Sequence, residues 1–548
     1  MNPFRAIPFL GQTILVVLFV AVLATWPLIF DLGGLLYRPV SDPDVQVGLW
    51  WPRAFWMSVL NGSDPFFASN LNWPSGQNLN LLLWNGGAQV FLAPALLFQD
   101  PVVALNVGAF WILLANGLTL AWLGWTVGKT RTAQLFGAVW GVCGGAYSIA
   151  EATSGRPEQA LIAPIALVLI GLHEMHRNPS DKRNWILCGI GLALTGSVYW
   201  FYAYFLVILT APIFIMHPPL RRGLVASSSI AIFTAIPALM VVLFGFYEQP
   251  NLYGHVLESQ PSNFTSSASV LFPSALLGGL WPGPIDPARW FSAIMVPVLV
   301  WVAFTGRGLV RAFALMGLAA AVFAIGPRLQ VLNAQSLVVG GKALAMPAEL
   351  LNFLPGFTRF WWPYRWLGVA VVATGASLAW AFRNRPILAA SLCLIMVVES
   401  MLMLRGNGHK EPYVSIEVPS CLEMIRDMGK PGPIFQIPDS SIVNGGVGWA
   451  AWHQQPINTG VGWHLNPIRT EQGVTNLQET IETKRGFRSR WTLEQTRGFH
   501  FVLLWRDYAE PDFEIQVEQV LGEPFFKDNL LSCWSLPGIS EPPKINPG

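Results

Sequence analysis

The sequence predicts an α-helical polytopic membrane protein of about eleven transmembrane helices, followed by a C-terminal extracytoplasmic α/β domain. Hydrophobic residues make up 53% of the 548-residue chain and charged residues 12%, about half the roughly 25% typical of soluble domains. The long apolar runs lie almost entirely within residues 1–404, whereas residues 405–548 have the composition of a water-soluble domain. Lysine and arginine are also divided unevenly between the loops.

A membrane-spanning helix needs about 20 mostly apolar residues. The first apolar run could be a signal peptide, but we interpret it as an uncleaved helix, because it is long and no small-residue cleavage site follows it. Trp185–Met216 is too long for one span, so we expect two helices that meet near Ser197–Tyr199. Leu79–Gln99 is broken by Asn, Gly and Pro, so we expect an interfacial or re-entrant helix there. The predicted spans lie in Phe9–Phe30, Val102–Val127, Ala133–Ile149, Gln159–Met175, Trp185–Met216, Leu224–Tyr247, Trp290–Phe304, Val310–Ile325, Trp366–Ala381 and Ile387–Leu404.

The basic residues orient these helices, because short cytoplasmic loops are enriched in Lys and Arg. With the N-terminus in the cytoplasm, the short loops on that side hold eleven Lys and Arg residues, whereas the much longer outer segments before residue 405 hold eight. The opposite side then has three long loops, 32–101, 248–289 and 326–365, and residues 405–548. The cytoplasmic basic residues are Lys129, Arg131, Arg177, Lys182, Arg183, Arg221, Arg222, Arg307, Arg311, Arg383 and Arg385. A net charge of +2 gives no reason to expect nucleic acid as a partner.

The soluble tail has the pattern of a small α/β domain. We predict a helix at Ile416–Met428 and strands at Pro433–Ile437, Phe499–Leu504 and Phe513–Val520. Cys421 and Cys533 are expected to form a disulfide if the tail lies in an oxidising compartment. Five tail residues could bind a sugar by stacking, or form the core of the domain or its contact with the membrane loops: Trp449, Trp452, His453, Trp463 and His464.

The first outer loop begins with two carboxylates, Asp42 and Asp44, directly after the first predicted helix. Carboxylates at this spacing can face one cavity, where they act as a general base or as ligands of a divalent metal ion. The alternative is a solvated turn. The loop continues with Trp50-Trp51, Gly62-Ser63-Asp64-Pro65-Phe66 and Trp73-Pro74-Ser75-Gly76.

Two later motifs follow in order. They are Ser154-Gly155-Arg156-Pro157-Glu158-Gln159-Ala160-Leu161, and Leu354-Pro355-Gly356-Phe357 through Trp362-Pro363-Tyr364-Arg365. Together with the first loop they resemble the GT-C superfamily of glycosyltransferases, and in particular a largely uncharacterised group of bacterial GT-C-like membrane proteins. The resemblance implies a cell-envelope enzyme of the bacterial inner membrane, with a periplasmic tail, that uses a polyprenyl-phosphate-linked sugar donor on the outer face.

The resemblance also assigns roles to individual residues. Asp44, or Asp42, is the candidate catalytic base, and Glu151 and Glu158 are candidates for a second acidic group. Because no second Asp-x-Asp pair stands near Glu151 and Glu158, dependence on a divalent metal, Mg or Mn, is left open.

Four arginines lie at membrane-surface depth in this topology and are candidates for binding the donor phosphate, because the planar guanidinium pairs with phosphate oxygens. The resemblance favours Arg365 and Arg359 over Arg53 and Arg156. The alternative is that these side chains anchor helix ends at the interface. His255 and Glu258 form another candidate acid–base pair, or an ordinary surface pair.

The expected function is therefore transfer of a sugar from a polyprenyl-phosphate-linked donor to an acceptor on the extracytoplasmic face. The main alternative is a non-catalytic structural or accessory subunit on a GT-C-like scaffold, since fold does not determine function. That alternative would recruit protein partners through the C-terminal domain. A transporter would need ionisable residues in mid-span, and Glu399 lies near a span end.

Overall fold

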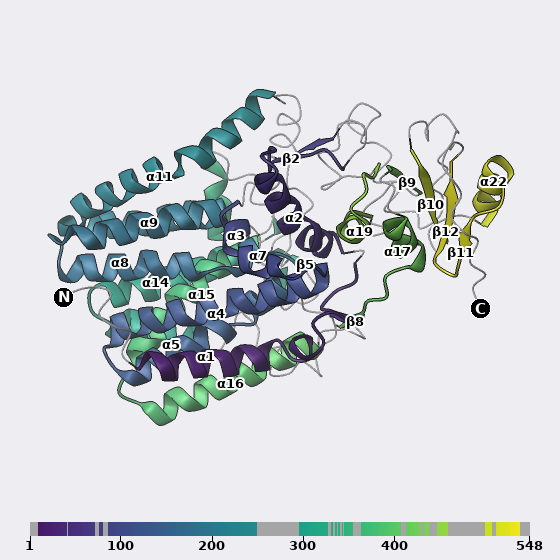
Figure 1. The fold of residues 1–548 in the computed structure, drawn as a ribbon. Helices are drawn as coiled ribbons and strands as arrows, with labels where there is room; N and C mark the ends of the chain where they lie inside the picture. Colours follow the sequence, from purple (N-terminus) through teal and green to yellow (C-terminus); the bar gives the residue numbers. More distant parts are fainter. Residues whose placement is uncertain are drawn as a thin grey trace.

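The computed structural model describes residues 9–40, 42–71, 76–79, 86–248, 295–326, 330–331, 335–336, 338–339, 342–343, 345–354, 363–406, 413–428, 432–437, 446–458, 499–506 and 511–536. Within these residues, a bundle of long helices occupies one end of the molecule and an α/β domain the other (Figure 1). The chain is thus a polytopic helical protein with a separate C-terminal domain.

Each predicted apolar run forms helix in the part of the chain that the structure describes. The helices of the bundle are α1 (Leu10–Ala24), α4 (Pro101–Gly128), α5 (Arg131–Cys143), α6 (Tyr147–Thr153), α7 (Pro157–Ala160), α8 (Ala163–Arg177), α9 (Lys182–Val198), α10 (Trp200–Met216), α11 (Arg221–Glu248), α13 (Met295–Thr305), α14 (Leu309–Ala324), α15 (Leu367–Phe382) and α16 (Pro386–Gly406). Among the described residues, Pro101–Gly128, Pro157–Arg177 and Pro363–Phe382 are long and apolar enough to cross a bilayer. Shorter apolar helices accompany them, α1, α10, α13 and α14 among them.

The expected division of residues 185–216 is confirmed. Tyr199 has an extended backbone (φ −156°, ψ 100°) and stands between α9 and α10. Residues 86–97 form two short helices, α3 (Gly86–Phe91) and η2 (Ala93–Leu97). At about 1.5 Å per residue, neither can cross a membrane.

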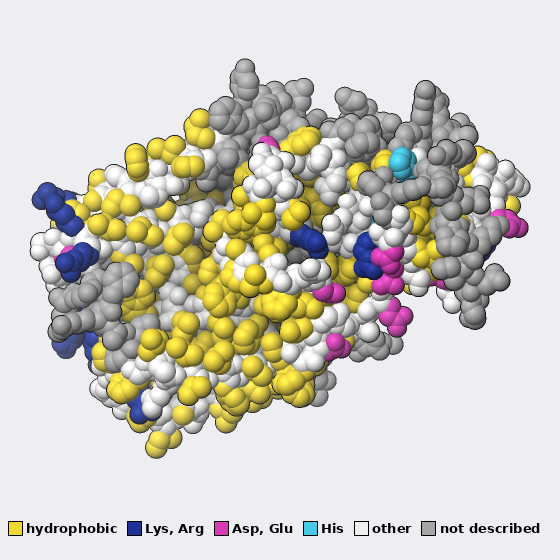
Figure 2. Space-filling view, in the orientation of Figure 1, with side chains coloured by type: hydrophobic (Ala, Val, Ile, Leu, Met, Phe, Trp, Pro, Cys, Tyr) yellow, Lys and Arg dark blue, Asp and Glu magenta, His cyan; other side chains and the backbone are white. Residues whose placement is uncertain are grey.

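The basic turns lie together at one end of the bundle. Thr130 donates a hydrogen bond to the Arg383 carbonyl oxygen (2.9 Å), which joins the turn after α4 to the turn after α15. The Arg385 guanidinium lies over the Trp301 ring, 5.9 Å from its centroid. Figure 2 shows Lys and Arg at the bundle end remote from the C-terminal domain, and hydrophobic side chains over most of the face between. Which membrane side this end faces remains a prediction.

The C-terminal domain is built on a four-stranded sheet. Its order is β11 (Phe526–Lys527), β12 (Leu531–Ser535), β10 (Phe501–Trp505) and β9 (Ile434–Ile437). β9 runs parallel to β10, and the other pairs are antiparallel. Helices α17 (Ser420–Asp427), α19 (Gly446–His453) and α22 (Pro511–Leu521) accompany the sheet.

The predicted helix and the first two predicted strands of this domain are present, but the strand expected at Phe513–Val520 is wrong. That segment lies in helix α22. Its alternating apolar residues suggest a strand, yet Val517 is buried while Ile515 and Val520 are about half exposed. Val517 and Leu521, four residues apart, pack against the sheet from one helical face.

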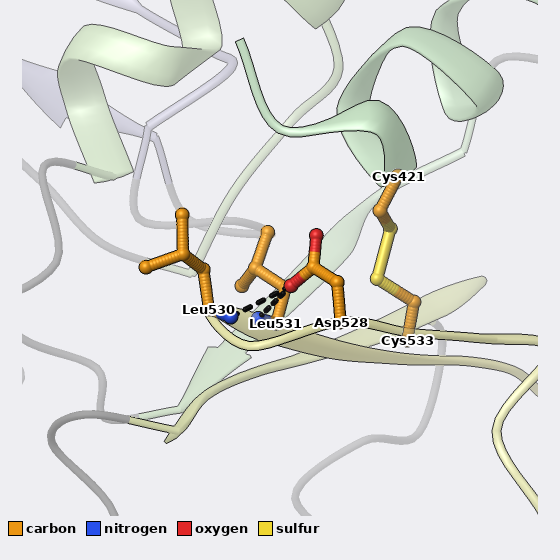
Figure 3. Close-up of a disulfide and its surroundings, with 5 residues drawn as sticks. All are labelled: Cys421, Asp528, Leu530, Leu531 and Cys533. Carbon is orange, nitrogen blue, oxygen red and sulfur yellow. Dashed lines mark hydrogen bonds between the residues drawn. A yellow bond between two sulfur atoms is a disulfide. The ribbon is translucent and has the colours of Figure 1, made fainter. Parts of the chain in front are cut away.

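A disulfide between Cys421 and Cys533, the pair considered in the sequence, joins α17 to β12 (Figure 3). Beside it, the Asp528 side chain accepts hydrogen bonds from the backbone N–H groups of Leu530 and Leu531, both 2.7 Å. These contacts fix the β11–β12 turn.

The first loop connects the bundle to this domain. It contains β1 (Leu35–Leu36), α2 (Pro43–Leu60), β2 (Phe67–Ala68) and β3 (Gln77–Asn78). β1 pairs with β8 (Val414–Ser415) at the start of the tail. Buried residues of α2, including Trp50 and Trp51, share one hydrophobic core with Trp449 and Trp452 of α19. Trp449 and Trp452 therefore belong to a core between α2 and the C-terminal domain, whereas Trp463 and His464 lie outside the described residues.

The last loop before α15 is described in short segments. They are β4 (Gln330–Val331), β5 (Gln335–Ser336), β6 (Val338–Val339), β7 (Lys342–Ala343), η6 (Pro347–Phe353) and η8 (Pro363–Trp366). η8 leads directly into α15 and carries Tyr364 and Arg365 to the bundle end that faces α2.

Candidate functional site

The two carboxylates of the first loop have different surroundings. Asp42 is the N-cap of α2, where its side chain accepts hydrogen bonds from the backbone N–H groups of Asp44 (2.9 Å) and Val45 (3.4 Å). Asp42 also pairs with Arg38 at 3.1 Å. Asp and Pro in these two positions are a common start for a helix. Asp42 thus holds the start of the helix, while Asp44 points toward another part of the chain.

The partner of Asp44 comes from the turn between α6 and α8. Asn116 of α4 holds this turn, because its amide donates to the Ala160 carbonyl (2.8 Å) and its oxygen accepts from the N–H groups of Ile162 (3.0 Å) and Ala163 (2.9 Å). These backbone groups lie at the break between α7 and α8, where the Ile162 N–H also donates to the Ala160 carbonyl oxygen (3.0 Å). A buried asparagine therefore fixes the segment that carries Arg156.

Gly155 allows this turn to lie against α2. Its φ is +84°, a conformation that L side chains rarely adopt. A Cβ atom at Gly155 would lie 2.5 Å from the Asp44 carbonyl oxygen, and one at Gly48 would lie 2.6 Å from the Gly155 Cα. The two backbones touch because both positions lack a side chain.

This close approach brings Arg156 into a cluster with two acids. One guanidinium nitrogen is hydrogen-bonded to the Asp44 carboxylate, and the other lies 3.2 Å from Glu151 Oε2 and 3.2 Å from the Tyr364 hydroxyl. The Glu151 side chain is fully buried, and that of Arg156 is 17% exposed. Residues from α2, α6, the following turn and η8 therefore meet at one point.

The charge on Asp44 is stabilised where it stands. Partial burial acts to raise the pKa of this carboxyl, but the charge and hydrogen bond of Arg156 outweigh it, with smaller contributions from Arg38 and Arg365. The pKa of Asp44 is therefore below its ordinary value, and the group is an anion at neutral pH.

Arg365 lies close to this cluster but has a different environment. Its guanidinium lies over the rings of Phe201 (5.0 Å to the centroid) and Tyr199 (5.6 Å). In the part of the chain that the structure describes, it forms no salt bridge, and its buried Nε has no hydrogen-bond partner. It interacts electrostatically with both Asp44 and Arg156. A guanidinium that no carboxylate neutralises, near an anionic acid, is suited to an anionic ligand.

The two acids do not fit a metal ion in this arrangement. The Arg156 guanidinium occupies the position between Asp44 and Glu151 where a cation would have to sit. No group of three or more His, Cys, Asp and Glu that could hold a metal occurs among the described residues. We therefore derive no step through a metal.

An apolar cavity of about 180 Å³ begins beside the cluster. Its wall includes Gly48, one turn after Asp44, and Ala152 and Pro157, the neighbours of Glu151 and Arg156. The rest comes mainly from α2, η2 and α4, and Arg53 and Gln99 are its polar members. Arg53 donates to the Gln99 carbonyl oxygen at 2.8 Å. Leu60 and Leu97 also face outward, 76% and 86% exposed.

The other predicted site residues either do not join this cluster or lie outside the described residues. Glu158 is half-buried in α7 and accepts a hydrogen bond from Gln159 at 3.4 Å. Among the described residues, no hydrogen bond or ion pair joins it to Asp44 or Arg156. Arg359, His255 and Glu258 lie outside the described residues. The structure therefore brings together Asp44, Glu151, Arg156 and Arg365 from the predicted set.

Three participants were not singled out from the sequence: Tyr364, Tyr199 and Gly155. Tyr364 lies in the last sequence motif, directly before Arg365, and this position is the signal that indicates it. Gly155 likewise lies in a sequence motif, directly before the candidate Arg156. The sequence around Tyr199 predicts only a bend between two helices, and nothing in its neighbours indicates the cluster.

No family model and no curated protein sequence matches the chain. Solved structures with the same fold do exist. ArnT from Cupriavidus metallidurans in the apo state is 12% identical, with a TM-score of 0.53 over 96% of this chain and 98% of that one. ArnT bound to undecaprenyl phosphate is 13% identical, with a TM-score of 0.53 over 97% and 99%.

A third match is the Archaeoglobus fulgidus oligosaccharyltransferase tethered with an acceptor peptide. It is 10% identical, with a TM-score of 0.50 over 90% of this chain and 69% of that one. The chain therefore has a GT-C-like fold, that of an integral membrane protein. At these identities the likeness establishes the fold alone.

Proposed function

We propose that this protein is a membrane glycosyltransferase that moves a sugar from a polyprenyl-phosphate-linked donor to an acceptor hydroxyl. The observation that carries the proposal is the cluster at the end of the bundle that faces the C-terminal domain. There an ionised Asp44 lies against Arg156, within electrostatic reach of the unneutralised Arg365. The solved relative with bound undecaprenyl phosphate supports a lipid-linked donor.

The reaction needs an acceptor oxygen made nucleophilic and a phosphate leaving group. Asp44 would accept a hydrogen bond from the acceptor hydroxyl and orient it toward the anomeric carbon. The acceptor oxygen forms a bond to that carbon while the bond from carbon to phosphate oxygen breaks, and the electron pair leaves with the phosphate. The acceptor proton passes to Asp44 and then to water. This direct displacement inverts the configuration at the anomeric carbon.

The arginines would stabilise the charge that develops on the leaving phosphate. Arg365 would bind the phosphate, since no described carboxylate pairs with it. Arg156 holds Asp44 and Glu151 together in this structure. A donor phosphate would compete with Asp44 for this guanidinium, and the exchange would free the carboxylate for the acceptor hydroxyl.

The apolar cavity between α2, η2 and α4 would take part of the polyprenyl chain. The cavity begins beside the cluster, and exposed apolar side chains surround it. A polyprenyl chain could therefore enter it from the bilayer. We propose that Arg53, a polar member of the cavity wall, contacts the lipid near the membrane surface. We propose that this end of the bundle faces the periplasm, where the buried Cys421–Cys533 disulfide would be stable.

The substitution Asp44→Asn tests the proposal, because it keeps the shape of the side chain and removes its charge. We expect transfer from a polyprenyl-phosphate-linked sugar to fall by about 10²- to 10⁴-fold, the range for a lost general base, with normal membrane assembly. The matched control is Asp64→Asn, an exposed residue of the same loop, which should leave transfer unchanged. Transfer at the wild-type rate in Asp44→Asn would contradict the proposal.

A second candidate, a non-catalytic scaffold, is favoured by one observation: Asp44 is already engaged by Arg156 and adjoins the core shared by α2 and the C-terminal domain. On that hypothesis the cluster is purely structural. Asp44→Asn would then leave any transfer in the membrane unchanged, and partners recruited through the C-terminal domain would be the function to seek.

A further inference from the structure

Two polar groups near the proposed phosphate site have no hydrogen-bond partner among the described residues: the Tyr199 hydroxyl and the Arg365 Nε. Both atoms are buried, and the Tyr199 side chain is 8% exposed. Buried polar groups in proteins are almost always paired, and an unpaired one is destabilising. Two such groups on neighbouring side chains require a physical explanation.

The local structure holds both side chains in place. Tyr199 stands in the bend between α9 and α10, and its ring packs edge-on against Phe201 and Tyr202, each 4.9 Å away between centroids. The Arg365 guanidinium lies over the Tyr199 and Phe201 rings. Because Arg365 follows Tyr364, whose hydroxyl contacts Arg156, the pair is connected to the Asp44 cluster.

The neighbouring tyrosines show that this environment can satisfy hydroxyl groups. The Tyr147 and Tyr202 hydroxyls are 2.6 Å apart, and Tyr202 also donates to the Gln159 carbonyl oxygen at 2.6 Å. Tyr364 accepts a hydrogen bond from Arg156 at 3.2 Å. Among these tyrosines, the Tyr199 hydroxyl alone is left without a protein partner.

The chemistry of the two unpaired groups specifies the ligand. The guanidinium N–H can only donate a hydrogen bond, and the phenol hydroxyl can also donate one, so a single ligand that accepts hydrogen bonds satisfies both groups. The positive charge of Arg365, which no described carboxylate neutralises, requires that partner to be an anion. A phosphate supplies several acceptor oxygens and a negative charge.

We propose that the Tyr199 hydroxyl and the Arg365 Nε–H bind the phosphate of the polyprenyl-phosphate donor together, and that Tyr199 distinguishes phosphorylated from unphosphorylated lipid. This inference rests on the proposed function and adds a binding residue to it. Tyr199 lies more than 150 residues from both Asp44 and Arg365 in the sequence.

The test is Tyr199→Phe in the full-length protein purified in detergent, with three separate probes: undecaprenyl phosphate, undecaprenol and inorganic phosphate. We expect the affinity for undecaprenyl phosphate to fall about tenfold, as for the loss of a hydrogen bond to a charged group, while the affinity for undecaprenol stays the same. The melting temperature should stay the same or rise, because the hydroxyl has no protein partner to lose.

Tyr202→Phe is the matched control. It removes a hydroxyl that two protein groups already satisfy, so the melting temperature should fall. The proposal is overturned if Tyr199→Phe leaves undecaprenyl phosphate binding unchanged, or if it weakens undecaprenol binding equally, which would indicate a packing role. Wild-type protein that binds inorganic phosphate as tightly as undecaprenyl phosphate would overturn the assignment to a lipid headgroup.

The outcome is separable from that of the proposed function. If Asp44→Asn retains transfer while Tyr199→Phe loses phosphate binding, the anion site stands and the role of Asp44 is wrong. If Asp44→Asn abolishes transfer while Tyr199→Phe binds normally, the reaction stands and the role of Tyr199 is wrong.

Discussion

At the scale of single residues, the site depends on small side chains as much as on charged ones. Asp44 and Arg156 meet because Gly155 and Gly48 let the turn after α6 touch the backbone of α2. Arg156 then has two carboxylates to bind, and Asn116 holds the turn from the opposite side. The charges supply the chemistry, and the glycines set the distance between them.

Gly155→Ala should therefore separate Asp44 from Arg156. The new Cβ would lie 2.5 Å from the Asp44 carbonyl oxygen, so α2 or the turn must move. We expect a sharp loss of transfer and a larger loss of stability than the roughly 1–2 kcal/mol of left-handed strain alone. Transfer assays and thermal melting of the purified protein measure the two effects.

Gly62→Ala is the control for backbone strain. Gly62 has a φ of +68° but nothing within 4 Å of the position of a Cβ. This variant should show the strain alone, with transfer retained. Equal effects of the two variants would mean that the contact between Gly155 and α2 does not matter.

At the scale of elements, α19 connects the C-terminal domain to α2, and a buried histidine lies at its end. His453 is 1% exposed, and its Nδ1 accepts a hydrogen bond from the backbone N–H of Gln455 at 3.0 Å. Burial lowers the pKa of His453 to about 3. The imidazole is therefore neutral in the folded protein at any pH near neutrality.

This depressed pKa predicts that acid destabilises the docking of α19. The unfolded chain binds a proton on His453 below about pH 6.5, whereas the folded protein does so only near pH 3. The contribution of neutral His453 to the free energy of unfolding is thus fully present above pH 6.5 and is lost as pH falls. At pH 5 the loss from this group is roughly 2 kcal/mol. Denaturation followed by tryptophan fluorescence, compared between wild type and His453→Gln, checks this. The variant should lose less stability between pH 7 and pH 5; parallel curves would contradict the expectation.

At the scale of the whole molecule, the basic turns lie at one end of the bundle. Helix α2, which carries Asp44, lies at the other end, beside the C-terminal domain (Figures 1 and 2). This arrangement agrees with the division of charge between the loops. The proposed function requires, in addition, that the cluster and the C-terminal domain face away from the cytoplasm, since the donor is used there.

Labelling with a membrane-impermeant thiol reagent tests this sidedness. Single cysteines at exposed Asn61, Glu523 and Ser180 report on the first loop, the C-terminal domain and the turn after α8. In intact cells we expect Asn61→Cys and Glu523→Cys to react, and Ser180→Cys to react only after the membrane is opened. Labelling of Asn61→Cys and Glu523→Cys on opposite sides would exclude a site shared between the first loop and the tail.

The sequence by itself determined the features that depend on local composition. These are the helical runs, the break at Tyr199, the separate C-terminal domain and the motifs that contain Asp44, Arg156 and Arg365. Apolar length and the grouping of basic residues are visible along the chain, so they could be predicted. The alternation at Phe513–Val520 misled because only tertiary packing shows which face of that segment is buried.

Only the tertiary structure decided which of the candidate residues meet. Asp44, Arg156 and Arg365 are separated by more than 100 residues at each step, and their approach depends on a glycine contact, an asparagine within α4 and a bend between two helices. The tertiary structure also distinguishes the two aspartates: Asp42 caps a helix, and Asp44 pairs with Arg156. Such contacts arise from the packing of distant backbones, a property that no single segment of the sequence carries.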